Sequence, residues 1–163
     1  MPDISFFASR QRDKQKHDHI RMEALVQRAK IRTAMFPFIW DRLIQQLNAK
    51  LVMYSAQVNR PFQLTSRRLV DGYLLGRKFS FPLVDLAISP VDDLAIKCDY
   101  GYRIDSDSPT HNWQRLVSIR VDTNQDTIIK CNGEVFMDDS ALADYLLRPL
   151  IDPDFDPSSP DYA

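Results

Sequence analysis

Glycine is scarce in this sequence, with four residues among 163. Because the four are isolated, no glycine-rich loop can be built to cradle a phosphate group. The Gly-x-Ser-x-Gly pattern of a serine nucleophile is also missing. The sequence therefore names no catalytic residue. It favours a non-catalytic protein and leaves open an enzyme, such as a hydrolase, whose site is assembled from distant residues.

Cysteine and histidine are scarce too, with two and three residues. Cys98 and Cys131 lie in apolar, strand-like runs, which predicts buried free thiols and not a disulfide framework. His17 and His19 are two residues apart in a helical stretch, so their side chains point about 160° away from each other. We therefore expect no metal site and no cofactor.

No apolar run approaches the ~18 residues that a membrane span needs. The N-terminal stretch turns polar after Ala8 and has no apolar run of signal-peptide length. These two absences predict a cytoplasmic protein without a membrane span.

The longest regular pattern present is an apolar stripe in the N-terminal third of the chain. Its residues recur every three or four positions, which is the period of one helix face. The eleven positions are Met22, Val26, Ala29, Thr33, Phe36, Trp40, Leu43, Leu47, Leu51, Tyr54 and Val58. Each large side chain of this kind contributes roughly 1.5–3 kcal/mol when it is buried. The stripe therefore has to be covered by a sheet, another helix or a second chain.

Pro37 interrupts the stripe without changing its phase, which predicts one long kinked helix or a pair of helices. A straight helix over the whole stripe would be roughly 55 Å long, against a radius of gyration near ~15 Å for a domain of this size. Its N-terminal part should therefore extend beyond the sheet and contact a second chain. The residues that we expect to bind this partner are Met22, Leu25, Val26 and Ala29, with Arg28 and Arg32 beside them.

Charge is distributed unevenly along the chain. Residues 1–60 carry 11 of the 21 Lys and Arg but only 5 of the 22 Asp and Glu, so the remainder is acidic. This division indicates either complementarity within the molecule or a basic surface that meets an acidic partner. A nucleic acid is not favoured as the partner, because neither interleaved aromatic residues nor a known docking motif accompanies the basic residues.

After Arg60-Pro61 the apolar period changes from three or four residues to two, which is typical of antiparallel strands with one buried face. The dipeptides Asp71-Gly72 and Asn132-Gly133 predict tight hairpin turns. We expect about six strands in consecutive hairpins, forming a curved, mainly antiparallel sheet with the long helix packed on it. The predicted fold class is α+β.

Asp138 or Asp139 is expected to cap a short C-terminal helix that ends near Ile151. Residues 152–163 contain four Asp and three Pro, which predicts a flexible acidic tail. The predicted organisation is thus one domain over residues 1–151, with residues 1–19 either extending the helix or mobile, and the tail.

Trp113 lies where a predicted loop over residues 105–114 meets a strand. An exposed tryptophan at such a junction can bind a partner, although it more often packs against the edge of the core.

Together these features predict a protein–protein interaction module, such as an adaptor, a chaperone-like protein or an assembly subunit. The partner is expected to be another protein or a second copy of the chain. The alternative is a protein that binds a small apolar ligand in a cavity between the helix and the curved sheet.

Overall fold

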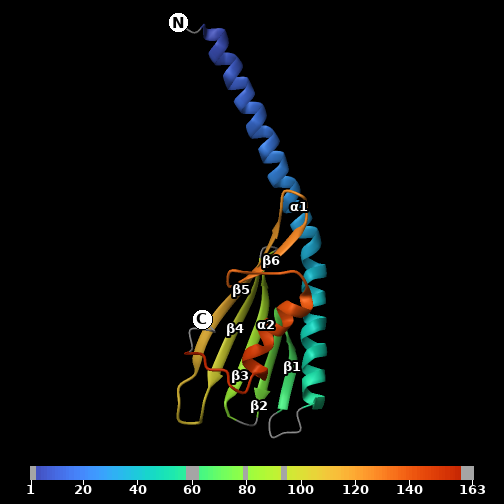
Figure 1. The fold of residues 1–163 in the computed structure, drawn as a ribbon, viewed down its shortest axis with the longest axis vertical. Helices are drawn as coiled ribbons and strands as arrows, with labels where there is room; N and C mark the ends of the chain where they lie inside the picture. The colour runs from blue at the N-terminus through green and yellow to red at the C-terminus, as the bar shows by residue number, and fades with distance from the viewer. Residues whose placement is uncertain (1–2, 58–62, 79–80, 93–94, 159–163) are drawn as a thin grey trace.

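The computed structural model describes residues 3–57, 63–78, 81–92 and 95–158. Two helices flank a run of strands (Figure 1). The elements are α1 (Ile4–Gln57), β1 (Gln63–Leu69), β2 (Gly72–Lys78), β3 (Leu83–Val91), β4 (Ala95–Arg103), β5 (His111–Val121), β6 (Thr127–Cys131), β7 (Glu134–Phe136) and α2 (Asp139–Ile151). The predicted α+β class is confirmed, with seven strands instead of about six.

The strands form one open sheet in which each strand pairs antiparallel with the next one along the chain. A hairpin is present at both predicted places: Cys131 pairs with Glu134 around Asn132-Gly133, and Leu69 pairs with Gly72, so the first turn is Val70-Asp71, one residue before the predicted dipeptide. Asn132 and Gly133 have φ values of 53° and 81°. Asparagine and glycine tolerate this left-handed conformation best, which explains why the dipeptide stands at this turn.

Strand β5 begins at His111, four residues before the start that its alternating pattern predicts. The extension pairs His111 with Tyr102 and Trp113 with Tyr100. The predicted loop over residues 105–114 is therefore too long at its C-terminal end. The polar side chains among these residues hide the strand, because cross-strand contacts between aromatic rings, and not alternation, stabilise it.

Helix α1 also begins earlier than predicted. The apolar stripe begins at Met22 and leaves open whether residues 1–19 extend the helix, but the helix starts at Ile4. Residues 10–19 extend it, since arginine, lysine and glutamine are good helix formers even without an apolar face.

Pro37 lies inside this continuous helix, so the alternative of two separate helices is wrong. Figure 1 shows that the helix axis changes direction where the projecting N-terminal part meets the part beside the sheet. A bend near a proline is expected, because the ring removes one backbone hydrogen bond and clashes with the preceding turn.

The hydrophobic core lies between the sheet and the two helices. From α1 it takes Phe36, Ile39, Leu43, Ile44, Leu47 and Leu51, and from α2 it takes Leu142, Ala143, Leu146, Leu147 and Leu150. The Tyr100 hydroxyl on β4 donates a hydrogen bond of 2.6 Å to the carbonyl oxygen of Leu146. This bond joins the buried face of the sheet to α2. Of the stripe positions, Phe36, Leu43, Leu47 and Leu51 are buried and those before Phe36 are not, while Val58 lies outside the described residues.

Two further predictions are met in the core and at its edge. Cys98 and Cys131 are buried free thiols. Asp138 caps α2, because its carboxylate accepts a hydrogen bond of 2.6 Å from the backbone N–H of Ala141. In the described part of the chain, no helix is both long enough and apolar enough to cross a membrane.

Candidate interaction surface on the N-terminal arm

The N-terminal half of α1 projects away from the rest of the protein (Figure 1). We call residues 4–32 the arm; at 1.5 Å per residue it is roughly 44 Å long. No residue of the arm is buried, and the first buried residue of the helix is Phe36. The arm therefore contributes almost nothing to the core and is available to other molecules.

Apolar side chains of the arm are exposed to solvent. Met22, Leu25 and Val26 are exposed to 59%, 48% and 50%, and Ala29 is exposed as well. A second group of exposed apolar residues stands at the tip of the arm: Ile4, Phe6 and Phe7. An uncovered apolar strip of this kind is typical of a contact surface. The sequence expectation that this segment extends beyond the sheet thus agrees with its exposure.

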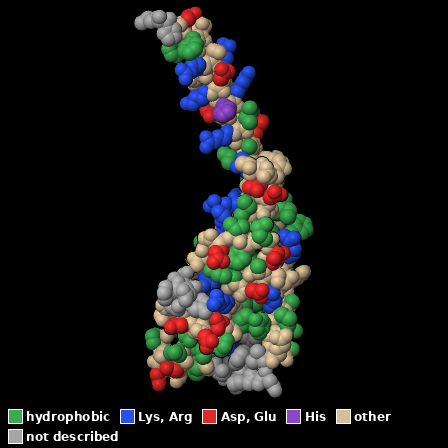
Figure 2. Space-filling view, in the orientation of Figure 1, with side chains coloured by type: hydrophobic (Ala, Val, Ile, Leu, Met, Phe, Trp, Pro, Cys, Tyr) green, Lys and Arg blue, Asp and Glu red, His purple; other side chains and the backbone are tan. Residues whose placement is uncertain are grey.

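The arm is also basic, with eight Lys and Arg against three acidic residues. Figure 2 shows basic side chains along the projecting helix with fewer acidic ones among them, and acidic side chains spread over the body below. The eight are Arg10, Arg12, Lys14, Lys16, Arg21, Arg28, Lys30 and Arg32. None of them forms an ion pair with another described residue. Intramolecular complementarity therefore does not account for the charge of the arm.

Lower on the same helix the basic residues are paired. Arg42 Nε lies 3.2 Å from Asp139 Oδ2, and Lys50 Nζ lies 2.8 Å from Asp144 Oδ1. Both acidic residues belong to α2. Among the described residues, the complementarity predicted from the charge division is thus present where the helix packs on its own domain and not on the arm.

Three arginines of the arm share one side of the helix. Arg21, Arg28 and Arg32 are seven and four residues apart, which is the spacing of one helix face. We call these three residues the basic flank. Each comes immediately before a stripe position, so the basic flank runs alongside Met22 and Ala29.

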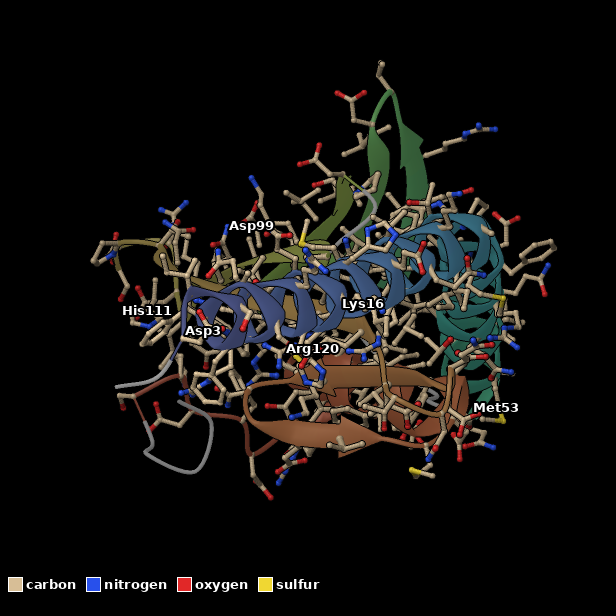
Figure 3. The ribbon with its side chains drawn as sticks, turned by 90° about the horizontal axis from the view of Figure 1, so that it is seen from above. Asp3, Lys16, Met53, Asp99, His111 and Arg120 are labelled. Atoms are coloured by element: carbon tan, nitrogen blue, oxygen red, sulfur yellow. The ribbon has the colours of Figure 1, made fainter. Side chains whose placement is uncertain are left out.

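The lower end of the basic flank meets the β5–β6 hairpin. Arg28 and Arg32 line a surface hollow of ≈ 340 Å³ together with Arg120 and Val121 of β5. Figure 3, which looks down the long axis, labels Arg120 beside the helix. The Nε atom of Arg32 is buried and has no hydrogen-bond partner among the described residues. Three guanidinium groups with no acidic residue in the lining make this hollow a favourable place for a carboxylate.

Trp113 is not an exposed anchor in this structure. Its ring is half-buried and stacks on Tyr100, with centroids 4.9 Å apart, and on Phe155, with centroids 5.5 Å apart. Of the two interpretations of its sequence position, partner binding and packing against the edge of the core, the structure shows the packing. Phe155 belongs to the tail that the sequence predicts to be flexible, and its burial departs from that expectation.

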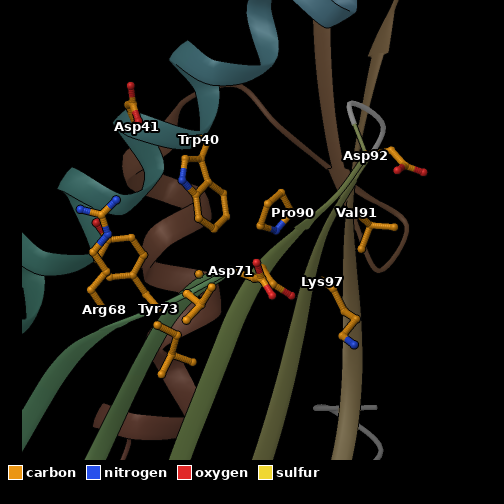
Figure 4. A pocket seen from close by; sticks show the side chains of 13 residues that line it. Trp40, Asp41, Arg68, Asp71, Tyr73, Pro90, Val91, Asp92 and Lys97 are labelled. Atoms are coloured by element: carbon orange, nitrogen blue, oxygen red, sulfur yellow. The ribbon is translucent and has the colours of Figure 1, made fainter.

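A second surface feature is a groove of ≈ 880 Å³ between Trp40 of α1 and the β1–β2 and β3–β4 turns (Figure 4). Its lining mixes apolar residues, such as Val70 and Val91, with charges of both signs. The lining residues do not include a nucleophile placed beside a base, so the groove does not indicate a particular reaction.

Metal and thiol chemistry finds no support in the remaining described residues. Among the described residues, no group of three or more His, Cys, Asp or Glu is placed to hold a metal ion. Burial raises the pKa of the Cys98 and Cys131 thiols, so neither is a reactive thiolate.

Comparisons with known proteins do not place this chain in a family. No family model, no curated protein and no solved structure matches the chain.

Sequence reasoning located the arm and two residues of its basic flank but missed Arg120 and the groove at Trp40. Arg120 is far from Arg28 in the chain, and only the pairing of β5 with its neighbours brings it to the helix. The pairing of Arg42 and Lys50 with α2 was equally hidden. Its only signal was the acidic composition of the second half of the chain.

Proposed function

We propose that this protein is a non-catalytic interaction module that binds another protein through the arm of α1. The observation that carries the proposal is the exposure of Met22, Leu25 and Val26 on the part of α1 that has no buried residue. In water an isolated helix is only marginally stable, and most helical stability comes from packing of an apolar face. A partner on the arm would supply that packing.

The charge of the arm supports the same proposal. The arm carries eight basic residues without an ion pair in the described structure, whereas Arg42 and Lys50 on the same helix are paired. Unpaired charges at the end of a projecting helix increase the rate of encounter with an oppositely charged surface.

The proposal is tested by photo-crosslinking in the cells that naturally make the protein. A photoreactive phenylalanine analogue placed at Leu25 is expected to form adducts heavier than the chain. The same analogue at Gln27, which lies about 200° around the helix, is the matched control and should give few adducts. Mass spectrometry of the adducts then distinguishes a second copy from a different protein.

A double variant completes the test. Leu25→Asp with Val26→Asp should abolish the adducts formed from an analogue at Met22, while the melting temperature stays within about 2 °C of wild type, because surface substitutions usually cost less than ~0.5 kcal/mol. If Leu25 gives no more adducts than Gln27, the arm is not a binding surface. If the double variant unfolds the protein, the segment belongs to the core.

The alternative from the sequence, a small apolar ligand between helix and sheet, stays an untested prediction. The groove at Trp40 is the place where α1 and the sheet turns leave space, and its polar and charged lining does not favour an apolar ligand.

A further inference from the structure

Helix α1 already binds one acidic amphipathic helix, namely α2 of its own chain. The contact has two parts. The apolar residues Leu43, Leu47 and Leu51 share a core with the leucines of α2. Beside them, Arg42 and Lys50 pair with Asp139 and Asp144.

The basic residues of this contact occupy fixed places relative to the stripe. Arg42 comes one residue before Leu43, and Lys50 comes one residue before Leu51. On the arm, Arg21 comes one residue before Met22, and Arg28 one residue before Ala29. The arm thus repeats the pattern by which the lower part of α1 holds α2. In the arm the apolar residues are exposed and the arginines have no ion pair among the described residues.

We propose that the partner of the arm is an acidic amphipathic helix, which packs on Met22, Leu25 and Ala29 and pairs its carboxylates with the basic flank. This inference rests on the proposed function and specifies the partner. From Arg21 to Arg32 the flank extends roughly 17 Å, which is three helical turns. A partner helix of about the length of α2, 13 residues, covers it.

The hollow at the β5–β6 hairpin supplies the strongest contact. Arg28, Arg32 and Arg120 converge there, and the buried Arg32 Nε has no hydrogen-bond partner among the described residues. Guanidinium groups bind carboxylates with two parallel hydrogen bonds. A carboxylate of the partner therefore pairs with guanidinium groups that meet no acidic residue in the lining of the hollow, which makes this end of the flank favourable for an acidic helix.

A second copy of the arm is the less favourable occupant. Two arms would bring the same eight basic residues together, and like charges repel. An acidic helix gains from the same charges. The two occupants respond to salt in opposite ways: binding of an acidic helix weakens as the salt concentration rises, whereas pairing of two basic arms strengthens.

The test is a titration of the full chain with a fluorescent peptide that carries the α2 sequence, residues 138–152. We expect saturable binding by fluorescence anisotropy. Arg28→Glu with Arg32→Glu should raise the dissociation constant about tenfold or more. The matched control is Arg12→Glu with Lys30→Glu, which changes the same charge on the opposite side of the arm and should leave the constant within about twofold.

A control peptide separates specific docking from general attraction between charges. It has serine in place of Leu142, Leu146 and Leu150, and it should bind at least about tenfold more weakly if the apolar stripe takes part. Equal binding of both peptides, equal loss in both pairs of variants, or no saturable binding would each overturn the inference. If crosslinks from Leu25 persist in the Arg28→Glu, Arg32→Glu variant, the proposed function stands and the acidic helix is rejected.

Discussion

Among single residues, Trp113 illustrates how one side chain links distant parts of the chain. Its indole lies between Tyr100 of β4 and Phe155 of the C-terminal segment. Offset-stacked rings of this kind contribute about 0.5–1.5 kcal/mol beyond their buried area. A segment that composition predicts to be flexible is thereby attached to the sheet at Phe155.

Two buried ionisable side chains, Cys98 and Tyr100, make the stability of the folded protein depend on pH. Burial raises the pKa of the Cys98 thiol and of the Tyr100 hydroxyl above their ordinary values of 9.0 and 10.0. In the unfolded chain both groups lose their protons as the pH rises through these ordinary values, whereas in the folded protein they keep them. The free energy of unfolding should therefore be constant near neutral pH and fall above about pH 9.

Urea unfolding at a series of pH values between about 7 and 10.5 measures this decline. Cys98→Ala is the control variant, and the decline should be shallower in it because one group with a raised pKa is gone, while Cys131 and Tyr100 still contribute. A profile that stays flat to the alkaline limit, or rapid reaction of Cys98 with a thiol reagent in the native protein, would contradict the buried position of this residue.

Among the elements, helix α1 has two parts with different surroundings. From Phe36 to Leu51 its apolar face is buried against the sheet and α2, while the arm has no buried residue. Pro37 lies at the junction between the two parts. The bend at this junction sets the direction in which the arm leaves the domain, and with it the position of Arg28 and Arg32 relative to Arg120.

Replacing Pro37 by Ala tests the role of the bend. Alanine restores one backbone hydrogen bond and a better helix propensity, worth up to ~3 kcal/mol in an isolated helix. We expect little stabilisation or a loss, because straightening the helix would disturb the packing of Phe36 and Trp40. Thermal unfolding measures the change. A rise of several degrees in the melting temperature, with unchanged crosslinking from Leu25, would show that the bend has no structural role.

The whole molecule consists of a packed body and a projecting arm. The body holds the core of both helices and the sheet, and the arm carries exposed basic and apolar side chains (Figure 2). The arm contributes no buried residue to the core, which is the reason for proposing that it binds a partner.

Removing residues 1–32 should leave the body folded. None of the described residues in this segment is buried, and the helix that remains still contains all six of its core residues. We expect a melting temperature within about 3 °C of that of the full chain. The dependence of the unfolding free energy on urea concentration, the m-value, should also change little, because the arm buries almost no surface in the core. Circular dichroism and urea unfolding measure both. Loss of cooperative unfolding would show that the arm stabilises the body.

The sequence by itself determined the elements that depend on local patterns. The three-to-four period of the stripe defined α1, alternation defined most of the strands, and Asn132-Gly133 and Asp138 defined a turn and a cap. These signals lie within a few residues of the structure they specify, so they can be read without knowing the fold. The exposed position of Met22 and Leu25 also followed from the sequence, because the helix is longer than a domain of this size.

The tertiary structure alone decided which residues meet across the chain. It brought Arg120 to Arg28 and Arg32, paired Arg42 and Lys50 with α2, and placed Phe155 against Trp113. Charge and aromatic character are visible in a sequence, but a contact depends on strand register and on how the helices pack against the sheet. A basic residue immediately before an apolar stripe position is paired at Arg42 and Lys50 but unpaired at Arg21 and Arg28 among the described residues, for this reason. Both parts of the helix carry similar side chains, and only one of them lies within reach of α2.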